Sequence, residues 1–163
     1  MNEDAVAVTP DAVWLEANGW KTLEDDGGLI GHVGPFWLRA DHGTARLGFI
    51  ADTRHRNRGG HVQGGMIAAL ADRAMGQTVR MANGNQPQVT IQLDMHYIDV
   101  MRMGEFIEAR CRVVRQARQI AFVEAEIFAN GRLAATARGV WKMIRRRTDD
   151  SAAAAPALPE SRA

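Results

Sequence analysis

The stretch NRGGHVQGGMIAALAD, from Asn57 to Asp72, places two glycine pairs directly before an apolar segment that carries a single acid. Across residues 64–82, apolar residues recur at intervals of three and four, which predicts an amphipathic helix. The apolar positions of this pattern are Ile67, Leu70, Ala71, Ala74 and Met75. Glycine at a helix start lets another molecule approach the free N–H groups of the first turn, so this turn is a candidate binding site. Taken by itself, the single acid of this segment, Asp72, is better explained as a surface or ion-paired helix residue than as a catalytic one.

Four segments after this helix alternate apolar and polar residues, the third of them less strictly, as strands do when one face of an antiparallel sheet is buried. They span residues 90–98, 105–114, 119–129 and 132–144. The predicted apolar face holds Ile91, Leu93, Met95 and Tyr97 in the first segment, and Leu133, Ala135, Ala137, Gly139, Trp141 and Met143 in the last. Asn130-Gly131 predicts a hairpin turn between the last two strands. Two further strands, joined by a tight turn, are predicted within residues 28–41 and 43–53.

The rest of the chain completes a single domain. Residues 9–20 predict a short helix, with Thr9 as its cap, Pro10 at its first position and Gly19 at its end. Residues 148–163 are rich in alanine, proline and acids and predict a disordered tail, so the domain spans residues 1–147. The predicted fold is α+β: one long central helix wrapped by a curved antiparallel sheet of about six strands, plus the short N-terminal helix.

The composition is that of an ordinary globular protein: of 163 residues, 46% are hydrophobic and 24% charged, and the net charge is +1. That charge calls for no nucleic-acid partner. No apolar run approaches the roughly 20 residues that span a bilayer, and the acidic N-terminus is not a signal peptide. We therefore expect a cytoplasmic protein without a membrane partner, which the single cysteine, Cys111, also suits. Neither metal-ligand spacing nor a G-x-S-x-G motif is present, so no metal and no serine nucleophile are expected.

The opening stretch, with the segments around it, resembles the hotdog-fold thioesterases of the phenylacetic-acid-degradation (PaaI-like) type. The likeness covers residues 34–144 and rests on the order of a strand, the pattern N-x-x-G-x-x-[H]-G-G, an apolar helix with an acid, and four antiparallel strands. GPFWLRAD, RHRN, GGMIAALADRAMG and GVWKMI stand where that family has similar segments. The resemblance implies an acyl-CoA thioesterase that needs no cofactor, since coenzyme A is part of the substrate. It also implies a homodimer that pairs again to a tetramer.

The family's catalytic positions fall on Asp72, Gly64, Gln63, Asn57 and Thr90 here. The Gly64 N–H is the expected donor to the thioester oxygen, since it lacks a partner within the helix. Asp72 is the expected general base or nucleophile, and Thr90 is expected to hydrogen-bond the water or Asp72. Asn57 either orients water or holds its turn. Because eight helical residues, about 12 Å, separate Gly64 from Asp72, the family's solution is to face Gly64 of one subunit with Asp72 of the other.

One residue departs from the family pattern: Gln63 stands where histidine often precedes the glycine pair. Its amide still donates a hydrogen bond, so Gln63 is expected to assist the oxyanion. Gly65 and His61 are expected to contact substrate. These residues also have structural interpretations: glycines that permit close packing, Asn57 as an ordinary turn residue, and Asp72 as a surface acid or one paired with Arg73 or Arg80.

Cations are needed for the phosphates of coenzyme A, and Arg115, Arg118 and Arg145 are the candidates. The basic run at residues 145–147 also fits a solvated end to the last strand. Two other functions fit the pattern. A non-catalytic acyl-CoA sensor or scaffold would keep the glycines without needing Asp72, whereas a hotdog hydratase or dehydratase would need a catalytic histidine, for which only His61 is available.

Overall fold

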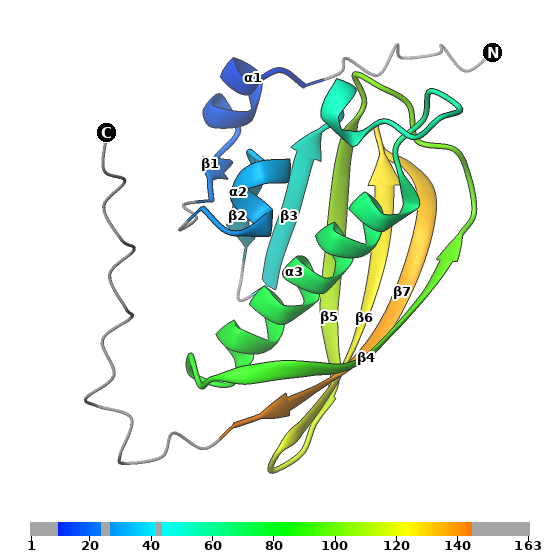
Figure 1. Ribbon diagram of the computed structural model, residues 1–163. Coiled ribbons are helices and arrows are strands. Elements are labelled where there is room, and N and C mark those ends of the chain that lie inside the picture. The colour runs from blue at the N-terminus through cyan, green and yellow to red at the C-terminus, as the bar shows by residue number, and fades with distance from the viewer. Residues whose placement is uncertain (1–9, 24–26, 42–43, 145–163) are drawn as a thin grey trace, which may run out of the picture.

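A single long helix, α3 (Gly64–Ala82), lies against one face of a seven-stranded antiparallel sheet that curves around it (Figure 1). The computed structural model describes residues 10–23, 27–41 and 44–144. The strand order is β1-β2-β3-β5-β6-β7-β4, so β4 forms one edge of the sheet. This is the α+β architecture expected from the sequence, and the predicted bounds of the long helix are confirmed.

The strands and helices have these bounds: β1 (Lys21–Thr22), β2 (Trp37–Asp41), β3 (Thr44–Ile50), β4 (Gln88–Tyr97), β5 (Phe106–Gln116), β6 (Ile120–Ala129), β7 (Arg132–Met143), α1 (Ala12–Ala17), α2 (Leu29–Val33) and the 3₁₀ helix η1 (Thr53–His55). The short β1 is the strand beyond the six expected. Its two residues pair with β2 and carry no apolar alternation to reveal them. The predicted C-terminal tail lies outside the described residues.

The core forms between α3 and the inner face of the sheet. All five apolar positions predicted from the helical spacing are buried. Small residues on the inner face let the strands and the helix approach closely. Gly139 is one of them, because a Cβ there would lie only 2.4 Å from the ring of Trp141. This places the buried Trp141 indole beneath Gly76 of α3.

Two predicted N-terminal features are wrong. The sequence predicts a strand within residues 28–41, with a bend or irregular start at Gly34-Pro35, but residues 29–33 form α2 and the strand begins only at Trp37. The carbonyl oxygens of Val33 and Gly34 accept hydrogen bonds from the side chains of His55 and Arg54, at 2.7 Å each, instead of pairing with a strand. The N-terminal helix begins at Ala12, after Pro10, because the carboxylate of Asp11 caps it by accepting from Trp14 N–H. The predicted cap, Thr9, lies outside the described residues.

Two predicted sheet faces also need correction. Leu133 is exposed, and Ala134 and Ala135 are both buried, because the pairing of β6 with β7 shifts by one residue at that point. On β4, Ile91 and Tyr97 are each 55% exposed. That strand is an edge and carries a register shift next to Thr90, so its apolar side chains are only partly covered.

Candidate functional site

The first turn of α3 presents free backbone donors at an open surface. Gln63 is the N-cap, and its side chain makes no capping hydrogen bond. The N–H groups that bond back to the Gln63 carbonyl are those of Met66 and Ile67. In the described part of the chain, the N–H groups of Gly64 and Gly65 therefore have no backbone acceptor, and they carry the positive end of the helix dipole. Nothing lies within 4 Å of the position of a Cβ on Gly65, so the turn is open to a ligand.

The loop before this turn is anchored to the core by His55. Its imidazole is buried; Nδ1 accepts from Asp52 N–H at 2.9 Å, which leaves Nε2 to donate to the Val33 carbonyl at 2.7 Å. The His55 carbonyl accepts from Gln63 N–H at 2.8 Å. His55 therefore fixes the start of α3 in place and is a structural residue of the core.

Asn57 holds a tight turn in that loop. Its Oδ1 accepts from His61 N–H at 3.1 Å, and its own N–H donates to the His61 carbonyl at 2.8 Å. These bonds favour the interpretation of Asn57 as a turn residue. His61 is exposed and pairs through its backbone with Arg102, while Val62 N–H donates to the Met101 carbonyl at 2.9 Å. The loop is thus braced from a second side.

The acid of α3 is joined to β4. Asp72 is half-buried, and its Oδ1 accepts from the Thr90 hydroxyl at 2.7 Å. The structure therefore brings together the two residues that the sequence paired. No described residue forms an ion pair with Asp72, so the alternative of pairing with Arg73 or Arg80 is not what the structure has. The second carboxylate oxygen remains available to a water or a substrate.

Asp72 faces a hollow of about 250 Å³ between α3 and the start of β4. Its lining includes Arg73, Gly76, Gln77, Arg80, Thr90 and Trp141. Gly64 does not line it. The two residues are eight positions apart on one straight helix, about 12 Å along its axis, so one chain does not bring them to the same reacting carbon.

Tyr97 is a residue of this region that the sequence interpretation missed as a site residue. Its hydroxyl donates to the Gly64 carbonyl at 2.9 Å, and its ring lies 3.5 Å from the position of a Cβ on Gly64. Tyr97 thereby joins the edge strand β4 to the first turn of α3. It is the only tyrosine of the chain, and its alternation with polar residues marked it as a sheet residue only.

Within one chain, the arginines expected to bind phosphates lie away from the first turn of α3. Arg118 is in the turn between β5 and β6, beside Gln86, at the opposite end of the sheet from the first turn of α3 (Figure 1). Arg115 lines a hollow with Phe122 and Val140 on the outer face of the sheet. Neither is brought near Gly64, and Arg145 lies outside the described residues.

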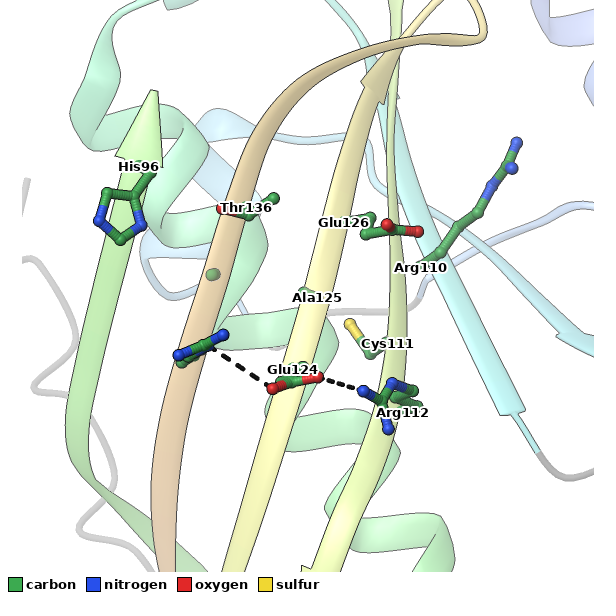
Figure 2. Close-up of a pocket in the computed structure, with 10 residues that line it drawn as sticks. His96, Arg110, Cys111, Arg112, Glu124, Ala125, Glu126 and Thr136 are labelled. Atoms are coloured by element: carbon green, nitrogen blue, oxygen red, sulfur yellow. Dashed lines mark hydrogen bonds and ion pairs between the residues drawn. The ribbon is translucent and has the colours of Figure 1, made fainter. Parts of the chain in front are cut away.

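A larger hollow, of about 480 Å³, lies on the outer face of the sheet with α3 behind it (Figure 2). Its charges are largely paired with each other. Arg112 and Arg138 both bind Glu124, the latter at 3.5 Å, as the dashed lines in Figure 2 show. Neither Gly64 nor Asp72 lines it, so this hollow is not the predicted site.

The described residues do not meet the requirements of a metal site, a membrane-spanning helix or an activated cysteine nucleophile. No three His, Cys, Asp or Glu side chains among them are grouped so as to hold a metal ion. Their helices also include none that combines the length and apolar character of a membrane span. Burial raises the pKa of the Cys111 thiol to about 12, so this cysteine is not an activated nucleophile.

Comparison with known proteins gives consistent results. Residues 59–135 match the thioesterase superfamily. A Pseudomonas aeruginosa protein named "Putative esterase PA0474" is 32% identical over 129 residues, which cover 77% of this chain and 95% of that protein. Human "Acyl-coenzyme A thioesterase 13" is 26% identical over 89 residues, or 53% of this chain and 64% of that protein.

Solved structures show the same fold. A mutant of the phenylacetic acid degradation protein PaaI from Thermus thermophilus superposes with a TM-score of 0.60 at 24% identity, covering 81% of this chain and 99% of that chain. The BH2602 protein from Bacillus halodurans, solved with CoA, gives a TM-score of 0.57 at 29% identity, covering 61% of this chain and 66% of that chain.

Proposed function

We propose an acyl-CoA substrate and a site shared by two subunits for this chain. The chain belongs to the thioesterase superfamily and is a thioester hydrolase of the PaaI-like, hotdog-fold type. The observation that carries the proposal is the Asp72–Thr90 hydrogen bond, placed two helical turns from an open, glycine-flanked helix N-terminus. These are the acid and the oxyanion donor that hydrolysis of a thioester requires.

The chemistry follows from these two parts. The thioester oxygen accepts a hydrogen bond from the Gly64 N–H, with Gln63 as a second donor, and the helix dipole stabilises the charge that develops there. With Asp72 as general base, water gives a proton to the carboxylate as its oxygen bonds to the carbonyl carbon. The C–S bond then breaks, and the proton passes to the departing thiolate. With Asp72 as nucleophile, its carboxylate oxygen bonds to the carbonyl carbon, the C–S bond breaks and the thiolate leaves, which gives an acyl anhydride. Water then hydrolyses the anhydride to the free acid and the Asp72 carboxylate, and the proton released goes to the thiolate.

The edge strand β4 supports pairing of two subunits. Its outer edge has no partner strand in the described structure, and Val89 and Ile91 of β4, with Ile98 directly after it, are each about half exposed. An unprotected apolar edge is a surface that a second chain covers. Antiparallel pairing of two β4 strands would turn the Gly64 of one chain toward the Asp72 of the other. A homodimer that pairs again to a tetramer is part of this proposal.

The loop before α3 supports a phosphate-bearing substrate. Arg56 and Arg58 are exposed on the turn that Asn57 holds, and Arg102, beside His61, is exposed as well. These cations are closer along the chain to the open helix terminus than Arg115 or Arg118, so we assign the phosphates of coenzyme A to the loop instead. The name of the human relative and the CoA in the Bacillus halodurans structure also favour this substrate. A cytoplasmic location, with no cofactor, completes the proposal.

The test is a panel of CoA thioesters, from acetyl to long-chain and aryl, with the released thiol followed by a colour reagent. We expect turnover of at least one class, and a dimer or tetramer by light scattering. A protein that hydrolyses none of the panel but cleaves thioesters of a smaller thiol would contradict the CoA assignment. An active monomer would contradict the shared site.

A further inference from the structure

The hollow beside Asp72 holds cations that lack partners. Arg73 and Arg80 both line it and lie seven residues, two helical turns, apart on one side of α3. Neither forms an ion pair with a residue in the described part of the chain. The Nε of Arg73 is fully buried and has no hydrogen-bond partner there. A buried guanidinium donor without an acceptor is costly, so this position favours a ligand that supplies one.

Several arginines on the sheet, in contrast, form ion pairs with glutamates. Arg46 and Arg110 both bind Glu108, at 3.3 Å and 3.0 Å, and Arg132 binds Glu105 at 3.2 Å. The pattern on the outer face is the same, where Glu124 takes two arginines (Figure 2). The hollow beside Asp72 differs from these clusters, because in the described part of the chain neither of its arginines meets an acid and one of them has a buried, unpartnered Nε.

The other polar groups of the hollow do not satisfy these cations. Asp72 is the one acid that lines it, and its Oδ1 is held by Thr90. The Gln88 amide is occupied, since it donates to the Gly76 carbonyl and accepts from Asn83. The groups left for a ligand are the two guanidinium groups and the Gln77 amide, above an apolar wall formed by Trp141 and Val89.

We propose that this hollow binds the far end of the acyl group and that this end is a carboxylate, so that the preferred substrates are ω-carboxyacyl thioesters. The inference rests on the proposed function, because it places the thioester itself at Asp72. A carboxylate accepts two hydrogen bonds from one guanidinium side, including the buried Nε of Arg73. Two cations outnumber the single charge of Asp72, and the apolar wall contacts the methylene groups. The small volume, about 250 Å³, favours short chains.

The experiment uses pairs of substrates that differ only in the terminal carboxylate: pentanoyl-CoA with glutaryl-CoA, and hexanoyl-CoA with adipoyl-CoA. Each acyl group is also tested as its N-acetylcysteamine thioester. The full chain is compared with Arg73→Met, which keeps the apolar stem, and Arg73→Lys, which keeps the charge but not the two-point geometry. Arg138→Met is the matched control, since Arg138 lies on the outer face.

We expect the wild type to have at least about tenfold higher kcat/KM for the carboxylated member of each pair. Arg73→Met should bring that ratio close to one while the alkyl substrate changes little, Arg73→Lys should keep part of the ratio, and Arg138→Met should keep all of it. Equal kcat/KM within each pair in the wild type would overturn the inference. An equal fall in kcat/KM for both substrates of a pair in Arg73→Met would also overturn it. If that variant also loses the dimer, Arg73 belongs to the subunit contact. A preference seen with N-acetylcysteamine thioesters but no cleavage of CoA thioesters would uphold the inference and refute the CoA assignment.

Discussion

Gly64→Pro isolates the proposed oxyanion donor, because proline has no backbone N–H. Gly64 is the first residue of α3, a position where proline is well tolerated, and Gln63 already has the extended backbone (φ −64°, ψ 132°) that precedes a proline. A Cβ at residue 64 would lie 3.5 Å from the ring of Tyr97, an ordinary contact. The helix should therefore stay intact while one donor is lost. Loss of one such donor costs about 10²–10³ in kcat, or roughly 3–4 kcal/mol of transition-state stabilisation.

Gly64→Ala is the matched control, since it adds the same Cβ and keeps the N–H. Its kcat should stay within about threefold of wild type, as for other substitutions that make only ordinary contacts. Steady-state thiol release from hexanoyl-CoA measures kcat, and far-UV circular dichroism with a thermal melt checks the helix and the fold. If the proline variant turns over as fast as the alanine variant, the carbonyl does not rest on the Gly64 N–H.

Three further predictions concern the proposed site, and a fourth concerns the buried cysteine. Asp72→Asn should keep the fold, since its amide oxygen can still accept from the Thr90 hydroxyl, and lose at least about a hundredfold in kcat. When Asp72→Asn is mixed with Gly64→Pro and the subunits are reassembled, random pairing should make about half of the dimers heterodimers, each with one intact site of its two. About a quarter of wild-type activity should then return, and no recovery would argue against a shared site. Gln63→Ala should lower kcat by up to about a hundredfold, and Gln63→His should stay active with a new pH dependence near pH 6.5; wild-type turnover in the alanine variant would make Gln63 a turn residue. Because burial raises the pKa of Cys111 from 9.0 to about 12, the thiol of the folded protein should not react with a thiol reagent at neutral pH. The stabilisation of the fold by the neutral thiol should be lost as the pH rises from 9 toward 12, and the melting temperature should fall in a way that Cys111→Ala does not show.

The sequence predicts those helices and strands whose apolar spacing follows directly from burial on one face. The spacing of apolar residues in α3, and the alternation along β5 and β6, arises from burial against one surface, and such periodicity is visible in the sequence. The segment that became α2 shows the limit. Its carbonyl groups are bound by side chains about 20 residues away, and no local pattern encodes that contact.

The site divides in the same way. By resemblance, Thr90 is expected to hydrogen-bond either a water or Asp72, 18 positions away, and the structure contains the bond to Asp72. The catalytic roles stay predictions. The sequence does not single out Tyr97 or Arg73 as site residues. Tyr97 is distinguished by its hydrogen bond to the Gly64 carbonyl, and Arg73 by a buried Nε without a partner, and both features exist only in three dimensions. The phosphate-binding arginines were chosen for charge alone. Charge does not reveal that Arg115 lies on the outer face of the sheet, away from α3.

The separation of Gly64 from Asp72 and the exposed edge of β4 follow from one choice of fold. A sheet that wraps a single helix must end in two edges, and here one of them, β4, carries the residue that binds the acid and the tyrosine that binds the first turn of α3. On the proposed assembly, a second chain laid along β4 covers the apolar edge and sets its own Gly64 opposite Asp72. Burial of the edge and completion of the site then occur in the same event, so substitutions that weaken subunit pairing at Ile91 should lower activity in step with the fraction of dimer.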